Sequence, residues 1–331
     1  MKSLHQVRIS WVLILMFACV MATPVIAEEC RVGSEIDTAT RTAIENAAQR
    51  YYQAAAAGNT ADLQQNSIPA VSSDFAGIQA AINENKDNFG TGSSIRGIYQ
   101  LDAQGNAPLK RAEFYCGIMN SPNYVGFAIP NLPPGNYALA MLDAQGGKNP
   151  ITVSFVLQQV GAQWKIGGVY IRPTAINGHD SKWYIAQAQQ YKAKGQNLNA
   201  WFYYLTAWDL AAPVRFMGTK ALDRIADEMQ SVRPQNPISP QSPVDLSFNG
   251  KSYKVTDLFP VPLTDGLGLV VKFQVPDVSN TAAAYADNVS VMKALLNQYP
   301  ELREAFVSIV ARAVAPSGND YGTLLSMKDI K

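Results

Sequence analysis

His179 is the residue of this chain best suited to acid–base chemistry. It lies in the segment Asn177-Gly178-His179-Asp180-Ser181, and a loop histidine beside an aspartate can act as a general base. The same residues also suit a structural role, because Asp180 or Ser181 can cap the helix expected next while His179 packs at a junction. No motif marks a partner for His179, so we favour the structural role, and the catalytic residues stay unknown.

Other patterns match known catalytic or cofactor motifs only in part. Ser290 and Lys293 have the Ser-x-x-Lys spacing of penicillin-interacting enzymes, but Ser-Asp-Asn and Lys-Thr-Gly are both absent from the sequence. The glycines of 90–97 do not form Gly-x-Gly-x-x-Gly, and they precede an expected strand where that motif needs a helix. We therefore expect no cofactor.

Two cysteines, Cys30 and Cys116, follow the first 27 residues. In an oxidising compartment a disulfide between them is the natural expectation, with two unpaired buried thiols as the alternative. His179 is the only histidine that could join them, which is too few ligands for a zinc site. We expect no metal.

The first 27 residues predict the compartment. Lys2 and Arg8 precede an apolar run at 9–20, and Val25-Ile26-Ala27 comes before Glu28. This order indicates a secretory signal peptide cleaved between Ala27 and Glu28, and the run is short for a membrane span. Cys19 offers the alternative of lipid anchoring at a lipoprotein-type site. The mature chain is thus expected to be periplasmic or extracellular, without an integral membrane segment.

Charge and composition exclude further classes. Loss of Lys2 and Arg8 changes the formal net charge from +1 to −1, so the mature chain has no basic excess for nucleic acid. Hydrophobic residues make up 47% of the sequence and charged residues 16%, which is typical of a folding chain.

The pattern of residues predicts an α+β protein of several units. Alanine-rich helices at 36–57 and 75–85 are followed by strand-like segments separated by Gly, Asn and Pro turns. We expect the helices to pack into the concave face of a bent antiparallel sheet. The expected units are a signal peptide at 1–27, a cone-like α+β domain at 28–176, a helical hairpin region at 177–232, a Pro-rich linker at 233–243 and a small α+β domain at 244–331.

This order of elements, ending in Trp164-Lys165-Ile166-Gly167-Gly168-Val169-Tyr170-Ile171, resembles the nuclear transport factor 2-like cone fold over about 34–173. The resemblance implies a conical pocket that many members use for small molecules and some for catalysis. Its enzymes place an Asp, a His or a Tyr in the cone. Because no histidine lies between the signal and His179, a His-based activity in the cone is not expected.

The segment 181–212 is rich in aromatic residues and predicts two helices. Small and aromatic residues fall at the spacing of one tetratricopeptide-like helical hairpin. Consecutive aromatics at 201–204 cover every face of a helix, which indicates either enclosure by flanking units or an exposed binding surface. In the enclosed case we expect them to attach the hairpin to the first unit. The candidate binding residues are Trp183, Tyr184, Trp201, Tyr204 and Trp208.

The C-terminal part begins after prolines at 234, 237, 240 and 243, whose period of three predicts a semi-rigid polyproline spacer. Asn249-Gly250 then predicts a hairpin between 244–248 and 251–255, followed by a strand at 267–275, a helix at 281–298 and strands at 306–314 and 321–327.

Two functional hypotheses follow. The favoured one is a non-catalytic module of the cell envelope that binds a small ligand or an unknown protein partner. The alternative is a His-independent isomerase or hydrolase in the cone, which would need an inward Asp or Glu near Tyr99, Tyr115 or Tyr170.

Overall fold

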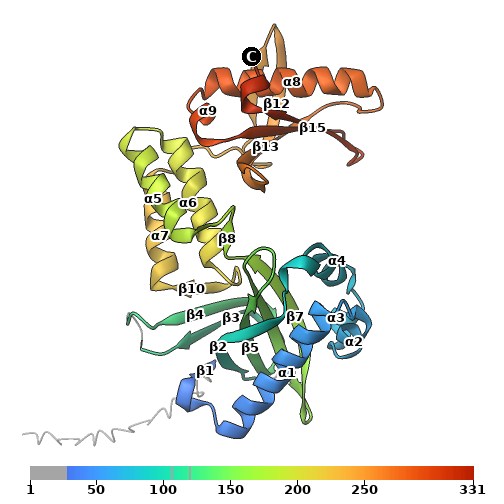
Figure 1. Cartoon of the computed structure of the whole chain (residues 1–331), viewed down its shortest axis with the longest axis vertical. Helices are drawn as coiled ribbons and strands as arrows, with labels where there is room; N and C mark the ends of the chain where they lie inside the picture. The colour runs from blue at the N-terminus through green and yellow to red at the C-terminus, as the bar shows by residue number, and fades with distance from the viewer. Residues whose placement is uncertain (1–27, 106, 119–120) are drawn as a thin grey trace, which may run out of the picture.

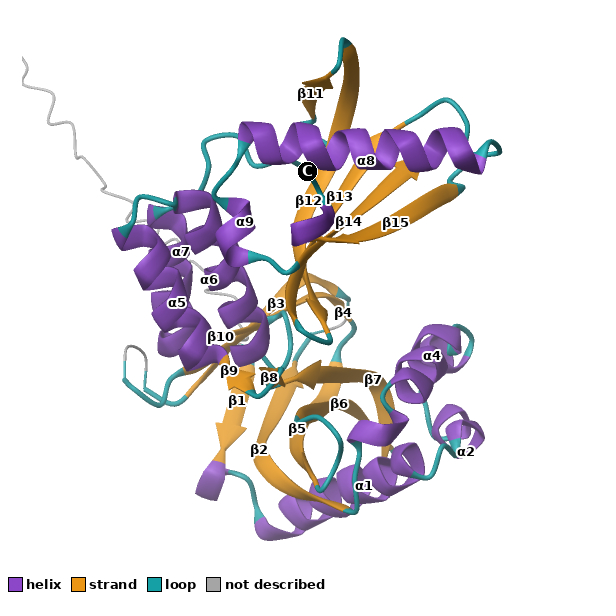
Figure 2. Ribbon diagram, turned by 45° about the horizontal axis from the view of Figure 1, so that its top comes forward, coloured by secondary structure: helices purple, strands orange, loops and turns teal. Residues whose placement is uncertain are grey.

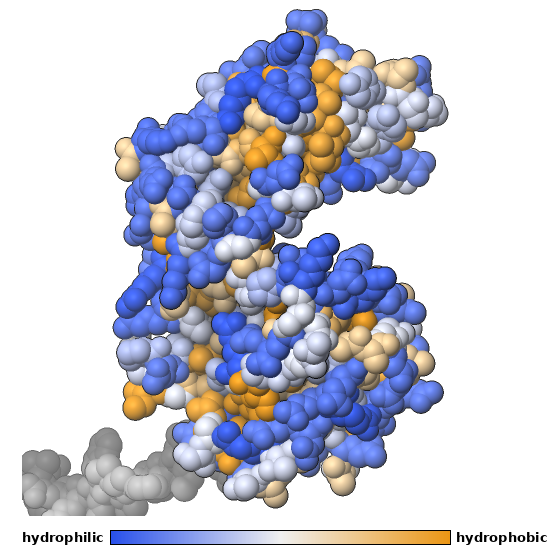
Figure 3. Space-filling model, viewed as in Figure 1, coloured by the Kyte–Doolittle hydropathy of each residue, from blue (hydrophilic) through white to orange (hydrophobic). Residues whose placement is uncertain are grey.

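The structure is a computed structural model that describes residues 28–105, 107–118 and 121–331, and it is of the predicted α+β class. A sheet-rich N-terminal part, a helical part and a second sheet-rich part follow one another along the long axis (Figure 1). A hollow opens on one side between the two sheet-rich parts, so the outline resembles a letter C (Figure 3). The expected signal peptide, the cleavage site after Ala27 and Cys19 lie outside the described residues.

The N-terminal part consists of short helices and long antiparallel strands. The helices are α1 (Thr38–Ala56), α2 (Thr60–Gln65), α3 (Pro69–Ser72) and α4 (Ala76–Glu84). The strands are β1 (Glu29–Val32), β2 (Gly92–Ala103), β3 (Leu109–Cys116), β4 (Val125–Leu132), β5 (Gly135–Gln145), β6 (Ile151–Val160) and β7 (Gln163–Pro173). The predicted helices at 36–57 and 75–85 are confirmed as α1 and α4.

Helix α1 covers one face of the main sheet, whose order is β1-β2-β5-β6-β7 (Figure 2). Asp37 caps the helix by accepting a hydrogen bond from the Thr40 amide at 2.9 Å. Ile44, Ala48 and Tyr52 lie on its inward face and pack against alternate residues of β5 and β6. This apolar layer is the first core of the molecule.

The opposite face of the main sheet is covered by a second, smaller sheet. The β3–β4 hairpin leaves the main sheet and pairs with β10 (Met217–Thr219), a strand contributed by the chain after the helical hairpin. Phe114, Phe127 and Met217 pack there against Leu139 and Met141 of β5. Strand β10 was not predicted from the sequence, because three residues are too few to show a strand period.

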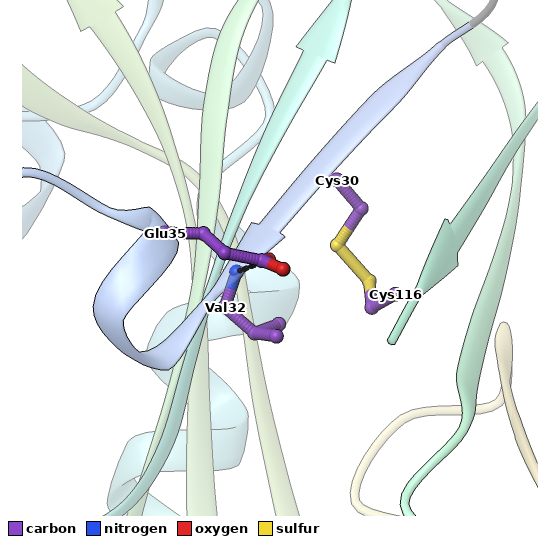
Figure 4. The surroundings of a disulfide bond; sticks show 4 residues. All are labelled: Cys30, Val32, Glu35 and Cys116. Carbon is purple, nitrogen blue, oxygen red and sulfur yellow. Dashed lines mark hydrogen bonds between the residues drawn. A yellow bond between two sulfur atoms is a disulfide. The ribbon is translucent and has the colours of Figure 1, made fainter. Parts of the chain in front are cut away.

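The predicted disulfide between Cys30 and Cys116 is present and joins β1 to the end of β3, with 5.1 Å between the two Cα atoms (Figure 4). Beside it, the Val32 amide donates to the Glu35 carboxylate at 2.9 Å. The bond fastens the first strand of the main sheet to the hairpin that covers it. This disulfide is compatible with an oxidising, exported location.

Three helices connect the two sheet-rich parts: α5 (Ser181–Ala193), α6 (Asn197–Ala211) and α7 (Lys220–Ser231). Two short antiparallel strands of two residues each, β8 (Ala175–Ile176) and β9 (His179–Asp180), precede these helices. Ala188, Ala200 and Ala207 are buried where α5 and α6 meet. Their small side chains let the backbones of the two helices come close. None of the helices in the described part of the chain has the length and apolarity needed to cross a membrane.

The C-terminal part is a five-stranded sheet with a long helix across one face (Figure 2). Its elements are β11 (Val244–Phe248), β12 (Lys251–Leu263), β13 (Gly266–Gln274), α8 (Thr281–Gln298), α9 (Leu302–Ala305), β14 (Ser308–Val314) and β15 (Asp320–Ser326). The predicted Asn249-Gly250 hairpin is confirmed, and both residues have the positive φ of its tight turn, 49° and 80°. Helix α8 is the crossover between the parallel strands β13 and β14.

The helices and the C-terminal sheet share one hydrophobic core. Tyr203 donates to the Ala305 carbonyl at 2.7 Å, and its ring meets Phe306 edge to face. The expectation that the aromatics attach the hairpin to the first unit is therefore wrong for most of them: they pack toward the C-terminal part. Sequence spacing shows which helix faces are apolar but not which neighbour covers them.

The expected polyproline spacer is also not a free, extended segment. Ser239 and Ser242 exchange backbone hydrogen bonds, which closes a tight turn that a polyproline helix cannot contain. Residues 232–238 pack beside α6 instead. The prolines at every third position thus build a fixed connection.

Candidate functional site

A groove with a volume of about 1160 Å³ lies between α5, α7 and the main sheet. Its floor is apolar, with Ile185 of α5, Tyr204 and Leu210 of α6, and Ile225 of α7. Charged residues of both signs line its rims: Arg96, Asp180, Lys182, Lys192, Arg224, Asp227 and Glu228. An apolar floor with a few convergent polar groups is the usual composition of a binding site.

Helix α5 forms the first wall of the groove. Asp180 caps it by accepting a hydrogen bond from the Trp183 amide at 3.0 Å. Ser181 donates to the Ala207 carbonyl at 2.7 Å, which ties the first turn of α5 to α6. The wall is therefore held in place from its first residue.

Helix α7 forms the second wall. Thr219 caps it by accepting from the Leu222 amide at 3.2 Å, and Leu222 and Ile225 are buried on its inner face. Because β10 pairs with β4 immediately before the helix starts, the position of this wall is set by the N-terminal part.

One end of the groove is closed by polar contacts between its walls. Lys192 of α5 donates to Glu228 and Ser231 of α7, each at 2.9 Å, and Tyr204 lies 3.4 Å from the same Glu228 carboxylate. The Lys192 hydrogen bond lowers the pKa of Glu228, and burial raises the pKa of Tyr204 to about 12. At neutral pH the tyrosine is protonated, and the charges of Lys192 and Glu228 compensate each other.

The other end of the groove lies on the main sheet, at Arg96, Tyr99 and Met141. Arg96 lies 3.2 Å from the Thr152 hydroxyl and 3.6 Å from the Asp143 carboxylate, and Thr152 donates to Asp143 at 2.6 Å. A bulge in β2 between Ile95 and Gly97 inserts Arg96 as an extra residue. The bulge is what places an arginine on this face.

Farther along the same sheet face, Arg172 of β7 pairs with Asp209 of α6 at 2.5 Å and joins the sheet to the helices. Ser154 is 0% exposed, and neither its hydroxyl nor the Arg172 Nε has a hydrogen-bond partner among the described residues. Sequence reasoning missed Arg96, Thr152 and Arg172. The available signal was polar Thr152 and Ser154 alternating with apolar residues in an otherwise buried strand.

His179 and Asp180, the candidate acid–base pair, are not arranged as a dyad. The ring of His179 stacks on Trp183 at 3.9 Å on an exposed strand, and the Asp180 carboxylate is engaged as a helix cap. The structural role that the sequence favoured describes these contacts.

The candidate binding residues are divided among different environments. Tyr184 is buried in the shared core, and Trp183 and Trp208 pack at its margin. Tyr204 forms part of the groove floor, and Trp201 lines a second cavity. They do not form one surface.

The space between α1 and the main sheet is filled by aromatic side chains. Tyr51 donates to the Trp164 carbonyl at 2.7 Å, and Tyr52 donates to the Phe89 and Gly92 carbonyls. Of the tyrosines considered for an enzymatic cone, Tyr99 lines the groove on the opposite face. Tyr115 donates to Glu113 at 2.7 Å on an exposed surface. The pair of Tyr115 and Glu113 therefore does not lie in the space between α1 and the main sheet.

Within residues 28–105, 107–118 and 121–331, no cluster of three or more His, Cys, Asp or Glu side chains could hold a metal ion. No protein-family model, curated protein or solved structure matches this chain.

Proposed function

We propose that this protein is an exported, non-catalytic interaction module that binds a segment of a partner protein in the groove between α5 and α7. The observation that carries the proposal is the groove itself, whose volume of about 1160 Å³ exceeds that of a typical small-molecule site and suits several consecutive side chains.

The charges of the rim indicate the kind of segment. Lys182 and Arg224, on opposite walls, have no salt bridge among the described residues, whereas Lys192 and Glu228 satisfy each other. The partner segment is therefore expected to combine apolar side chains for the floor with carboxylates that meet Lys182 and Arg224.

Other parts of the proposal rest on coarser support. The disulfide supports export, α1 across an antiparallel sheet supports a nuclear transport factor 2-like N-terminal domain, and the closely packed α5–α6 pair supports a tetratricopeptide-like hairpin. The charges of Lys192 and Glu228, which compensate each other in the groove, favour binding over the enzymatic alternative.

The test is photo-crosslinking in the protein's own cell envelope, with a photoreactive amino acid at Gln189 or at Gln190. Gln189 lines the groove, and its neighbour Gln190 is exposed on the same helix outside it. A protein adduct at position 189 that is missing at 190 is the expected result. Equal adducts at both positions, or none at either, would contradict the proposal.

Charge reversal provides a second measurement with the same complex. Lys182→Glu and Arg224→Glu should each weaken the crosslinked complex and increase its dissociation rate, because each places like charges against the partner. Lys110→Glu, an exposed lysine on β3 away from the groove, is the matched control and should leave the adduct unchanged.

A further inference from the structure

A second cavity, of about 330 Å³, lies between α6, the segment that follows α7 and the C-terminal part. Its volume is at the lower end of the range for small-molecule sites, about 300 to 1000 Å³. It therefore suits one small molecule and is too small for the protein segment proposed for the groove.

The walls of this cavity are apolar and come from separate elements. Leu198, Trp201 and Phe202 lie on one face of α6 because they are three and four residues apart. Leu258 of β12 and Tyr299 after α8 lie on the C-terminal side. Prolines 234 and 237 complete the wall with rings whose backbone φ is fixed.

Two side chains of opposite charge also line the cavity. Arg233 and Glu301 take part in no salt bridge or side-chain hydrogen bond among the described residues, although both charges lie at one small cavity. The backbone at Glu301 is fixed, because its carbonyl accepts a hydrogen bond from the buried Asn199 amide at 2.7 Å. Glu301 is half-buried at the cavity and its carboxylate has no hydrogen-bond partner among the described residues, so the carboxylate is available to a ligand.

We infer that this cavity binds a free α-amino acid with an aromatic or branched aliphatic side chain. Arg233 would donate hydrogen bonds from its guanidinium group to the ligand carboxylate, and Glu301 would accept hydrogen bonds from the ligand ammonium group. The apolar side chain would lie against the ring of Trp201, which is partly exposed and packs on the buried Phe202 at 5.0 Å.

Isothermal titration calorimetry of the full mature chain tests this inference, with L-phenylalanine, L-tryptophan, L-leucine and glycine as probes. At least one of the three apolar amino acids should bind with a dissociation constant below about 1 mM. Glycine should show no binding with a dissociation constant below about 1 mM, because it has no side chain to contact Trp201. Trp201→Leu should weaken binding of the aromatic amino acids more than that of leucine.

Two analogues that each lack one charged group separate the roles of the arginine and the glutamate. Arg233→Gln should weaken the binding of L-phenylalanine about tenfold or more. The same variant should leave the binding of phenethylamine, which has no carboxylate, unchanged. Glu301→Gln should weaken the binding of L-phenylalanine by a similar factor. It should leave the binding of 3-phenylpropionate, which has no ammonium group, unchanged.

The inference is overturned if none of the apolar amino acids binds with a dissociation constant below about 1 mM, or if both variants weaken the binding of all probes equally. It does not rest on the proposed function of the groove. The Gln189 crosslink reports only on the groove and the titration only on this cavity, so either proposal can fail alone.

Discussion

The core shared by the helices and the C-terminal sheet predicts that these two parts unfold together. Phe306 is 3% exposed and lies where α9 meets β14, with its ring 5.8 Å from Phe202 and 6.2 Å from Tyr203. Replacing a buried phenylalanine by alanine costs about 3 to 5 kcal/mol, because apolar contacts are lost and a cavity remains. Phe306→Ala should therefore remove most of the stability of a unit that spans α5 to β15.

The expected shift can be stated for urea. With a denaturant slope of about 2 kcal/mol per molar, a loss of about 4 kcal/mol lowers the midpoint by about 2 M. Hydrogen exchange with mass spectrometry at a series of urea concentrations measures this midpoint separately for each peptide. The urea midpoints of peptides from α5 to α7 and from β11 to β15 should fall by the same amount.

A variant in the other core is the matched control. Phe155 is 0% exposed and packs against Tyr51 below α1, so Phe155→Ala should lower the midpoint of the N-terminal peptides by a similar amount. The two parts meet at β10, at Phe216 and Met217 beside the second sheet, and at the Arg172–Asp209 pair, but their main cores are separate. Each variant should therefore lower the urea midpoint of the other part much less. If Phe306→Ala shifted the β11–β15 peptides and left those of α5 to α7 unchanged, the shared core would be refuted.

Three further predictions concern single bonds. Cys30→Ala with Cys116→Ala should lower the free energy of unfolding of the N-terminal part by up to about 4 to 5 kcal/mol, for a loop closed across 86 residues. The urea midpoint of the N-terminal peptides should fall accordingly, and reductant should then have no further effect. The hydrogen bond from Lys194 lowers the pKa of Glu304 below its usual 4.5. The ionised Glu304 carboxylate therefore stabilises the fold above pH 4.5, and this stabilisation is lost as the pH falls through the lowered pKa. The melting temperatures of wild type and Glu304→Gln should thus converge in acid, and a constant difference from pH 7 to pH 3 would contradict this. Asn288 of the Asn-Val-Ser sequon is 0% exposed and donates to β15, so Asn288→Ala should cost about 1 to 3 kcal/mol in urea unfolding, and the intact mass should carry no glycan at this residue.

Features set by neighbouring residues were predictable from the sequence. The Asn249-Gly250 turn forms because both residues tolerate positive φ, and α1 forms because alanines follow a capping position. The Cys30–Cys116 pairing was predictable because few cysteines were available.

Tertiary structure alone decided which elements meet. The β3–β4 hairpin pairs with β10, the aromatics of α6 face the C-terminal part, and the groove arises where α5, α7 and the main sheet converge. Hydrophobic periodicity shows which face of an element must be buried. The hydrophobic effect is non-directional, however, so the pattern does not select which surface covers that face.

The same distinction applies to the candidate sites. The sequence determined that His179 and Asp180 suit a helix start, because a cap depends on residues three positions apart. It did not indicate that Arg96 lies across from α7, or that Arg233 and Glu301 line one cavity, because these residues are far apart in the chain. Local backbone chemistry is encoded within a few residues, whereas a site built from distant segments exists only once the long-range contacts have formed.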